Sequence, residues 1–139
     1  MFIDASAIVA ILGREPGWEG FVHKLGTDDA ALYISPLVRF EAVQALARKQ
    51  TSPSVKPSAE TLQGARQILD AFIARLRIDE IPVSPQIGSL ALDASMTYGK
   101  AIGHAADLNF GDCFAYACAK ALDTPLVYKG NNFALTDLA

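Results

Sequence analysis

The sequence predicts an α/β domain with a short, mainly parallel central sheet flanked by helices. Short apolar runs alternate with longer segments in which apolar residues recur every three or four positions. Parallel strands need crossover connections, which are usually helical, so this alternation favours a sheet covered on both faces. The 139 residues suffice for one hydrophobic core, and we expect a single domain over residues 1–139.

The short apolar runs are expected to form the strands. The first run ends in an acid, Asp4, and the third is either a strand or an edge segment. The expected strands are residues 2–4, 32–34, 81–83 and 126–128. Ligands of parallel sheets bind beyond the carboxyl ends of the strands, so Asp4 and the loop after Tyr128 mark the expected site.

The longer segments are expected to form helices. Ser35 and Pro36 have the form of a helix start, with the hydroxyl as N-cap and the proline in the first turn. Prolines and serines in residues 51–58 interrupt the helical pattern, and the segment after them is clearly amphipathic. The expected helices are residues 6–12, 18–25, 36–49, 61–77, 85–98 and 109–122.

Composition and charge exclude several classes of protein. Hydrophobic residues make up 51% and charged residues 19%, which excludes a disordered chain. No apolar run approaches the roughly 18 residues of a membrane span, and no secretory signal precedes the first strand, so we expect a cytoplasmic protein. The net charge of −3 gives no general attraction to nucleic acid, and any contact with RNA or DNA must be local.

The cysteines and histidines do not form a recognisable metal or redox pattern. Cys113 and Cys118 lie five residues apart in one expected helix and point in different directions, so we expect buried thiols. His23 and His104 are isolated from each other and from the cysteines. This spacing argues against a zinc site and against a histidine-based triad.

Two acids stand out because their neighbours are apolar. Asp4 ends a buried strand, where a carboxylate is costly unless it is hydrogen-bonded, paired or bound to a metal; capping of the next helix explains it equally well. Glu41 shares a helical stripe with Leu37 and Ala45, so its carboxylate should face inward. Buried glutamate is uncommon without a partner, and we favour a functional role for Glu41 over a distant ion pair.

Asp112 completes a candidate set of three acids. It stands at the start of an expected helix, where complementing the helix dipole would be explanation enough. The expected fold can bring Asp112 together with Asp4 and Glu41, and carboxylates that converge in one cleft repel one another. A hard divalent cation relieves this repulsion, which points to Mg²⁺ or Mn²⁺. The other acids are expected at the surface, with Asp28 and Asp29 in a turn.

Four segments match a known family in order along the chain. They are FIDASA (residues 2–7), ISPLVRFE (34–41), LNFGDCFAYA (108–117) and PLVYKGNNF (125–133). Each is weak alone, but together they cover nearly the whole chain, and the sequence resembles the PIN-domain ribonucleases, above all the VapC-type toxins of bacterial toxin–antitoxin pairs. The resemblance implies a PIN-like three-layer α/β/α fold and an endoribonuclease that depends on Mg²⁺ or Mn²⁺.

The resemblance also assigns roles to individual residues. It implies that Asp4, Glu41 and Asp112 are the catalytic carboxylates and hold the metal, and that the Ser6 hydroxyl supports the site by hydrogen bonding. A metal held by carboxylates can activate water and stabilise the charge that builds on a phosphodiester, which agrees with the chemistry argued from the acids.

The chain departs from the family pattern at one position. Asn132 stands where an acid usually precedes the phenylalanine of the last segment, Phe133. An amide supports the site by hydrogen bonding but brings no charge, so we expect a second metal ion to bind weakly or not at all. Asp137 is a less favoured substitute for the missing acid.

RNA would have to be held by a few local cations, because the protein is acidic overall. The positive residues that flank the matching segments are the candidates: Arg14, Arg39, Lys100 and Lys129. Loss of one such contact should reduce the salt dependence of RNA binding.

Two other functions compete with the nuclease. The aspartyl-nucleophile phosphatases need a second aspartate two residues after the first, where this chain has Ser6. The stronger alternative is a catalytically weak or inactive PIN-like module that binds RNA or protein, and metal-dependent cleavage of RNA distinguishes it from the nuclease. The resemblance further implies a cognate antitoxin and a homodimer, and it implies no membrane partner.

Overall fold

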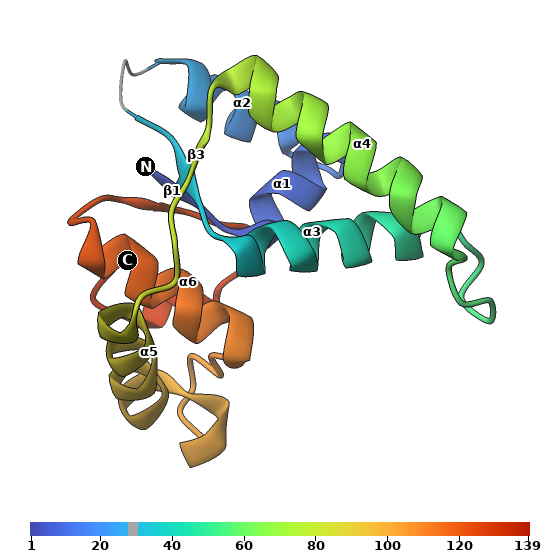
Figure 1. Cartoon of the computed structure of the whole chain (residues 1–139). Helices are drawn as coiled ribbons and strands as arrows, with labels where there is room; N and C mark the ends of the chain where they lie inside the picture. Colours follow the sequence, from blue (N-terminus) through green and yellow to red (C-terminus); the bar gives the residue numbers. More distant parts are fainter. Residues whose placement is uncertain (28–30) are drawn as a thin grey trace.

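The computed structural model describes residues 1–27 and 31–139, and these residues form a sheet of four short parallel strands (Figure 1). The strands are β1 (Phe2–Ile3), β2 (Tyr33–Ile34), β3 (Asp79–Glu80) and β4 (Leu126–Val127). They lie in the order β3-β2-β1-β4, and every pair is parallel, as predicted. The turn expected at Asp28 and Asp29 lies outside the described residues.

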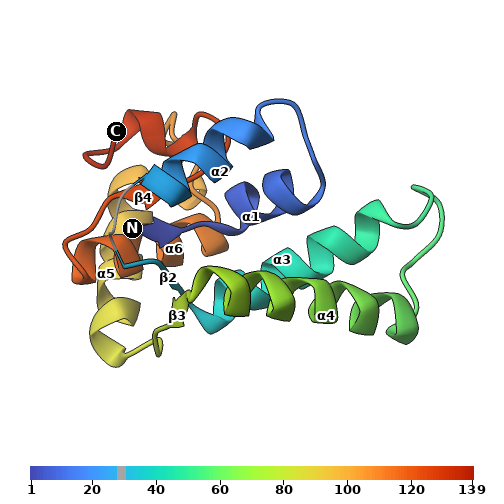
Figure 2. The same cartoon turned by 90° about the horizontal axis from the view of Figure 1, so that it is seen from above.

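Helices connect the strands and give the predicted three-layer α/β/α arrangement. They are α1 (Ala5–Leu12), α2 (Trp18–Thr27), α3 (Pro36–Lys49), α4 (Ala59–Leu76), α5 (Pro85–Tyr98) and α6 (Phe110–Ala121), with short 3₁₀ turns η1 (Lys100–Ile102) and η2 (Asn132–Leu135). α3 and α4 lie side by side and extend away from the sheet, while α5 packs on α6 (Figures 1 and 2). No helix in the described parts of the chain is long and apolar enough to cross a membrane.

The third strand is not where the sequence predicted it. The expected strand was residues 81–83, but β3 lies just before them and is exposed at the edge of the sheet. Ile81 still donates its backbone N–H to Ile34 O at 2.9 Å. Pro82 follows and has no N–H to offer, so the ladder cannot continue through it. Pairing with β2, rather than hydrophobicity, therefore sets the position of this strand.

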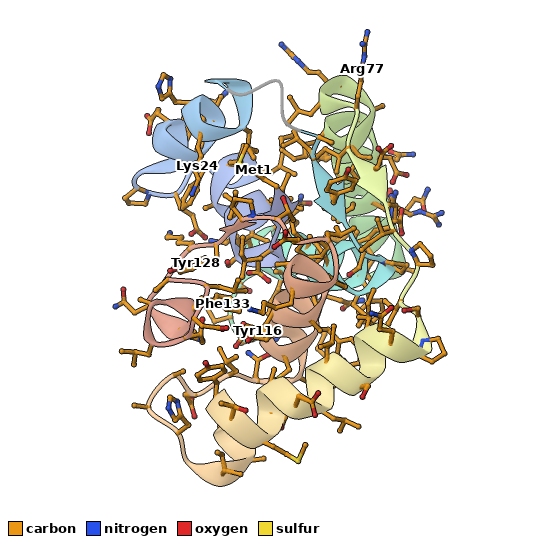
Figure 3. All side chains as sticks on the ribbon, turned by 90° about the vertical axis from the view of Figure 1, so that its left-hand side faces the viewer. Met1, Lys24, Arg77, Tyr116, Tyr128 and Phe133 are labelled. Atoms are coloured by element: carbon orange, nitrogen blue, oxygen red, sulfur yellow. The ribbon has the colours of Figure 1, made fainter. Side chains whose placement is uncertain are left out.

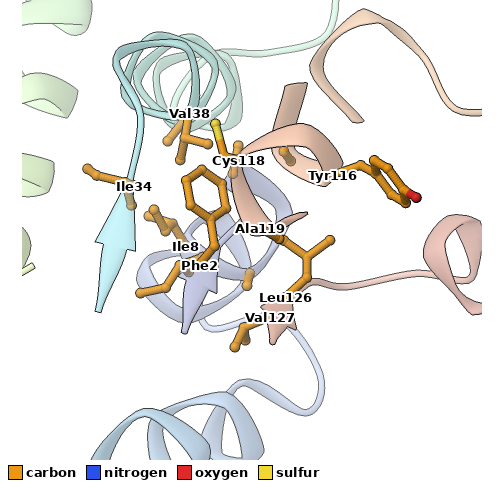
Figure 4. Close-up of a cluster of buried hydrophobic side chains, with 14 of the residues drawn as sticks. Phe2, Ile8, Ile34, Val38, Tyr116, Cys118, Ala119, Leu126 and Val127 are labelled. Atoms are coloured by element: carbon orange, nitrogen blue, oxygen red, sulfur yellow. The ribbon is translucent and has the colours of Figure 1, made fainter. Parts of the chain in front are cut away.

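The hydrophobic core surrounds β1, the second strand from the edge formed by β4. Phe2 has no exposed surface and packs among Ile8 of α1, Val38 of α3 and Cys118 of α6 (Figure 4). Burying an apolar side chain of this size contributes about 1.5–3 kcal/mol. Cys113 and Cys118 are both free and buried, which confirms the prediction of structural thiols.

The order of the strands reverses at β1. From β1 the chain runs outward through β2 to β3, and α5 and α6 then return it to β4 on the other side of β1. In open parallel sheets, ligands bind beyond the carboxyl ends of the strands at such a reversal. Asp4 directly follows β1 and donates its backbone N–H to Val127 O of β4 at 2.9 Å. The fold therefore places Asp4 at the position where a ligand is expected.

Candidate active site

Asp4 is a buried carboxylate at the end of β1. It is also the N-cap of α1, and its Oδ2 accepts hydrogen bonds from the Ser6 backbone N–H at 2.9 Å and from the Ser6 hydroxyl. Only 5% of the residue is exposed. Burial raises the pKa of Asp4, the hydrogen bonds from Ser6 oppose that rise, and the nearby charge of Asp112 adds to it. Capping and a functional role are thus compatible at Asp4.

Ser6 connects Asp4 with the segment that follows β4. Its hydroxyl donates to Asp4 Oδ2 and accepts the backbone N–H of Lys129 at 3.0 Å. The donor and one acceptor position of this hydroxyl are therefore both used, which fixes its orientation. These two hydrogen bonds are the geometry that the supporting role implied by the resemblance requires.

Glu41 lies on α3, and its half-buried carboxylate faces the other two acids. The pKa of Glu41 is raised from 4.5 to about 7, first by burial and then by the charges of Asp4 and Asp112. The inward orientation predicted from the helical stripe is therefore correct. The site therefore disfavours the ionised form of Glu41, as it does that of Asp4.

Gly111 makes room for the Glu41 carboxylate, a role that the sequence reading missed. A Cβ at position 111 would lie 2.1 Å from Glu41 Oε1, far inside van der Waals contact. The carboxylate of α3 therefore rests against the backbone at the start of α6, and a side chain at position 111 would displace it. The signal available in the sequence was a glycine inside a helix, directly before a candidate acid.

Asp112 sits in the first turn of α6 and forms a capping box with Asn109. Asn109 Oδ1 accepts the Asp112 backbone N–H at 3.1 Å, and Asp112 Oδ2 accepts the Asn109 backbone N–H at 3.0 Å. Asp112 Oδ2 also accepts a hydrogen bond from Asn132 Nδ2 at 3.2 Å. Asp112 therefore does stabilise the start of α6. Its charge also raises the pKa of Asp4 and of Glu41.

The three acids form one electrostatic group. Across residues 1–27 and 31–139, none of the three forms an ion pair with a lysine or arginine. Repelling oxygen ligands without a protein cation suit a hard divalent metal such as Mg²⁺ or Mn²⁺ in their chemistry. Within the same described residues, however, no three acidic, histidine or cysteine side chains stand close enough to hold an ion as they are placed. A cation would have to draw the carboxylates of Asp4, Glu41 and Asp112 closer together.

The cations suggested for RNA binding all have interactions within the protein. Arg39 donates from Nε to Glu80 Oε2 at 2.8 Å and also pairs with Asp70, on the side of α3 that faces α4 and β3. The other three interact as follows: Lys129 pairs with Glu15, Lys100 lies 3.9 Å from Asp107, and the guanidinium of Arg14 lies 5.9 Å from the Trp18 ring centroid. Of the four, only Lys129 is linked to the acids by hydrogen bonds within the described residues: its backbone N–H donates to Ser6, whose hydroxyl donates to Asp4.

Asp137 is held away from the three acids. It accepts hydrogen bonds from the Tyr116 hydroxyl at 2.6 Å and from Lys120 Nζ at 2.9 Å. These two donors lower the pKa of Asp137 and account for its charge. The structure therefore does not bring Asp137 into the site as a substitute for the missing acid.

A groove beside Glu41 contains two cations that the sequence reading did not select. It has a volume of about 600 Å³ and is lined by Phe40, Gln44, Arg48 and Lys49 as well as by Glu41. These residues lie on one face of α3. They are spread over seven to nine residues of the helix, which corresponds to roughly 10–14 Å along its axis. Helical spacing from Glu41 was the signal that could have identified them.

Comparison with known proteins identifies the family. A model of the PIN domain matches residues 1–138. The chain belongs to the PIN-domain family.

Curated relatives narrow the assignment. A VapC ribonuclease of Rhizobium meliloti is 47% identical over 139 residues, covering 99% of this chain and 98% of the relative. Ribonuclease VapC30 of Mycobacterium tuberculosis is 35% identical, covering 100% of this chain and 96% of the relative. Ribonuclease VapC of Mycolicibacterium smegmatis is also 35% identical, with 100% and 98% covered. The predicted resemblance to the VapC-type members of the PIN family is confirmed.

Proposed function

We propose that this protein is an endoribonuclease that cleaves RNA phosphodiester bonds with Mg²⁺ or Mn²⁺ and acts as the toxin of a toxin–antitoxin pair. The observation that carries the proposal is the raised pKa of Asp4 and of Glu41 beside the charge of Asp112, where the strand order reverses. The relatives, which are named VapC ribonucleases, support RNA as the substrate class.

The chain's own residues orient the ligands of the cation. Ser6 fixes Asp4, and the capping box with Asn109 fixes Asp112. Glu41, whose pKa is about 7 without metal, would hold a cation as its ionised carboxylate. A bound divalent cation lowers the pKa of water and stabilises negative charge on the phosphodiester. Ser6 and Asn109 thus position the acids, and Asp4, Glu41 and Asp112 supply the negative charge.

RNA would be held next to the acids by local cations. Lys129 and Lys49 both pair with Glu15, and Arg48 lies on the same groove as Lys49. A phosphate group that reaches Lys129 or Lys49 competes with the Glu15 carboxylate for the same ammonium groups. Arg39 would have to leave two carboxylates at once, which makes it the least available of the proposed RNA contacts.

A cognate antitoxin, a homodimer and a cytoplasmic location follow as proposals from membership of the VapC-type group. Exposed apolar side chains give the surface that contacts with protein partners need. Two of them, Leu92 and Phe110, line a groove of about 880 Å³ between α5 and α6. A partner on this face would lie next to Asp112, because Phe110 and Asn109 line the groove.

The proposal is tested by cleavage of a panel of structured RNAs, tRNAs included, with Mg²⁺, with Mn²⁺ and with EDTA. Asp4→Asn should abolish cleavage, because it removes a charged ligand at nearly constant shape. Asp93→Asn is the matched control: Asp93 is an exposed aspartate on α5, outside the proposed site. Cleavage that requires metal, disappears in Asp4→Asn and persists in Asp93→Asn supports the nuclease.

The alternative is a PIN-like module that binds RNA or protein without cutting, and Asn132 in place of an acid is the observation that favours it. Binding of the same RNAs without cleavage by either the wild type or Asp93→Asn would support this alternative. Metal-independent cleavage that persists in Asp4→Asn would reject the proposed site. Removal of any bound antitoxin, checked by mass spectrometry, precedes all of these assays.

A further inference from the structure

Phe40 is an exposed aromatic ring on α3, directly before Glu41. The residue is 64% exposed, whereas the rings of Tyr128 and Phe133 pack on each other with their centroids 4.9 Å apart (Figure 3). In the described parts of the chain, Phe40 has no aromatic partner. The face of the Phe40 ring is therefore open to contact with another molecule.

Phe40 begins a stripe of three side chains along α3. Gln44 and Arg48 follow it at intervals of four residues, so the three lie on one face of the helix, about 12 Å from first to last. Across residues 1–27 and 31–139, the side chains of Gln44 and Arg48 form no hydrogen bond or ion pair. The stripe thus presents an aromatic ring, an amide and a guanidinium to solvent.

Two adjoining grooves run along this stripe. The first has a volume of about 600 Å³ and is lined by Phe40, Glu41 and Arg48, among others. The second, of about 520 Å³, shares Gln44 and Arg48 with the first and extends to Lys56 in the segment between α3 and α4. Glu41 is the only acid among the described residues that line the two grooves. The grooves therefore lead from the three acids to a basic surface.

The charge of this surface favours a polyanion over a protein segment. Arg48 and Lys56 are exposed and have no acid partner in the part of the chain that the structure describes. Lys49, which pairs with Glu15, lines the first groove as a third cation. Phosphates that contact such cations release counterions, which favours binding of nucleic acid. An apolar protein segment would instead need further apolar groups along the stripe, where Gln44 and Arg48 stand.

We propose that this stripe of α3 binds single-stranded RNA, with Phe40 stacking on a base and Arg48 holding a phosphate. Stacking on an aromatic ring accepts any base, because every base has a π-face. Gln44, between the two, can both donate to and accept from a base edge. The bases of a duplex are stacked on one another, so a ring on a helix surface reaches a base face only in a loop or an unpaired end. Phe40 therefore makes the protein favour single-stranded over double-stranded RNA.

The inference rests on the proposed function only in taking RNA as the substrate. The test is binding of a short single-stranded RNA and of a fully paired duplex, measured by fluorescence anisotropy on the full chain in EDTA. Phe40→Ala should weaken binding of the single strand about tenfold and leave binding of the duplex nearly unchanged. Ile102→Ala is the matched control, because Ile102 is 57% exposed on η1, outside both grooves. This control should leave both affinities unchanged.

Two further variants separate stacking from the burial of an apolar side chain. Phe40→Leu keeps an apolar side chain but has no ring face, whereas Phe40→Trp offers a larger ring. Phe40→Leu should bind the single strand as weakly as Phe40→Ala, and Phe40→Trp should bind it at least as tightly as the wild type. Tight binding by Phe40→Leu would contradict stacking.

The basic end of the stripe is tested by the salt dependence of binding. Arg48→Gln should reduce the slope of log affinity against log salt by about 0.7 for a single strand, because one phosphate contact is lost. Arg75→Gln is the matched control: it removes the same charge from an exposed position on α4, outside both grooves. An equal change of slope in the two variants would reject Arg48 as a phosphate contact.

The failure of this inference and the failure of the proposed function are distinguishable. Binding of the single strand by Phe40→Ala as tightly as by the wild type, or an equal loss on both RNAs, would overturn the role of Phe40. The first of these results would favour a protein partner on this face, and both would leave metal-dependent cleavage intact. Binding that depends on Phe40, without cleavage in Mg²⁺ or Mn²⁺, would support the inference and overturn the nuclease. Absence of binding to either RNA by the wild type would overturn the inference.

Discussion

Carboxylates occur in this protein in two opposite environments. Glu15 lies between Lys49 and Lys129, and these partners lower the pKa of Glu15. Asp4 and Glu41 face other acids, and burial and like charge raise the pKa of both. The ionised carboxylate of Glu15 is therefore favoured in the folded protein, whereas the ionised forms of Asp4 and Glu41 are disfavoured.

The difference shows which acids are structural and which are available for chemistry. The charge of Glu15 is satisfied by the protein itself, because both lysines lie within ion-pair distance. The charges of Asp4, Glu41 and Asp112 have no lysine or arginine partner in residues 1–27 and 31–139, so a cation from solution is the natural complement. A set of variants can separate the two environments.

The largest expected effect comes from filling the space beside Glu41. Gly111→Ala places a methyl group where the Glu41 carboxylate lies and should lower the cleavage rate about 100-fold, or about 2.7 kcal/mol in activation free energy. Gly64→Ala on α4 is the matched control, because a Cβ there meets nothing within 4 Å. Single-turnover RNA cleavage measures both, and equal rates for the two variants would contradict the assigned role of Gly111.

An effect of similar size is expected on stability when metal binds the folded protein. Saturating Mn²⁺ should raise the free energy of unfolding by about 2–3 kcal/mol at roughly 100 times its dissociation constant. Asp4→Asn and Glu41→Gln should lose most of this gain, whereas Glu15→Gln should keep it, since Glu15 is already paired. Chemical denaturation with and without Mn²⁺ provides the measurement. Loss of the gain in Glu15→Gln alone would place the metal elsewhere.

The smallest effect is the pH dependence of stability without metal. The raised pKa of Glu41 favours its neutral form in the folded state, so its contribution is present below about pH 4.5 and is lost as pH rises through about 7. Because Glu41 is partly exposed to solvent, we expect a loss of only about 1 kcal/mol over this range. Glu41→Gln should flatten the profile. Glu15 has the opposite sign: its contribution is lost as pH falls below 4.5, the ordinary value.

The local parts of the structure could be predicted from the sequence. Ser35 caps α3 through the Val38 backbone N–H at 3.3 Å, with Pro36 in the first turn, as its residue types indicate. Such signals act over a few residues and need no knowledge of the fold. Asp4 and Glu41 could be selected for a similar reason, since each stands out against apolar neighbours, whereas Asp112 was selected only together with them.

Features that depend on distant elements could not be predicted. Arg39 pairs with Asp70 and Glu80, which belong to elements far along the chain. The sequence does not show these ion pairs, and without them Arg39 looks free to contact RNA. Gly111 looked unremarkable until α3 was seen to bring a carboxylate against it. The hydrogen bond from Asn132 to Asp112 likewise joins the last turn to α6. These are tertiary contacts between distant segments, and the spacing of residues in the sequence does not predict them.

The central claim is that the three acids repel one another until a divalent cation joins them, and ¹³C NMR titration of the Glu41 carboxyl tests it most directly. Without metal, Glu41 should titrate near the value of about 7. Saturating Mg²⁺ should bring its pKa below about 5, because the cation favours the ionised form. Asp4→Asn should lower the pKa of Glu41 even without metal. A carboxyl that titrates near 4.5, its ordinary value, and does not respond to Mg²⁺ would contradict the account.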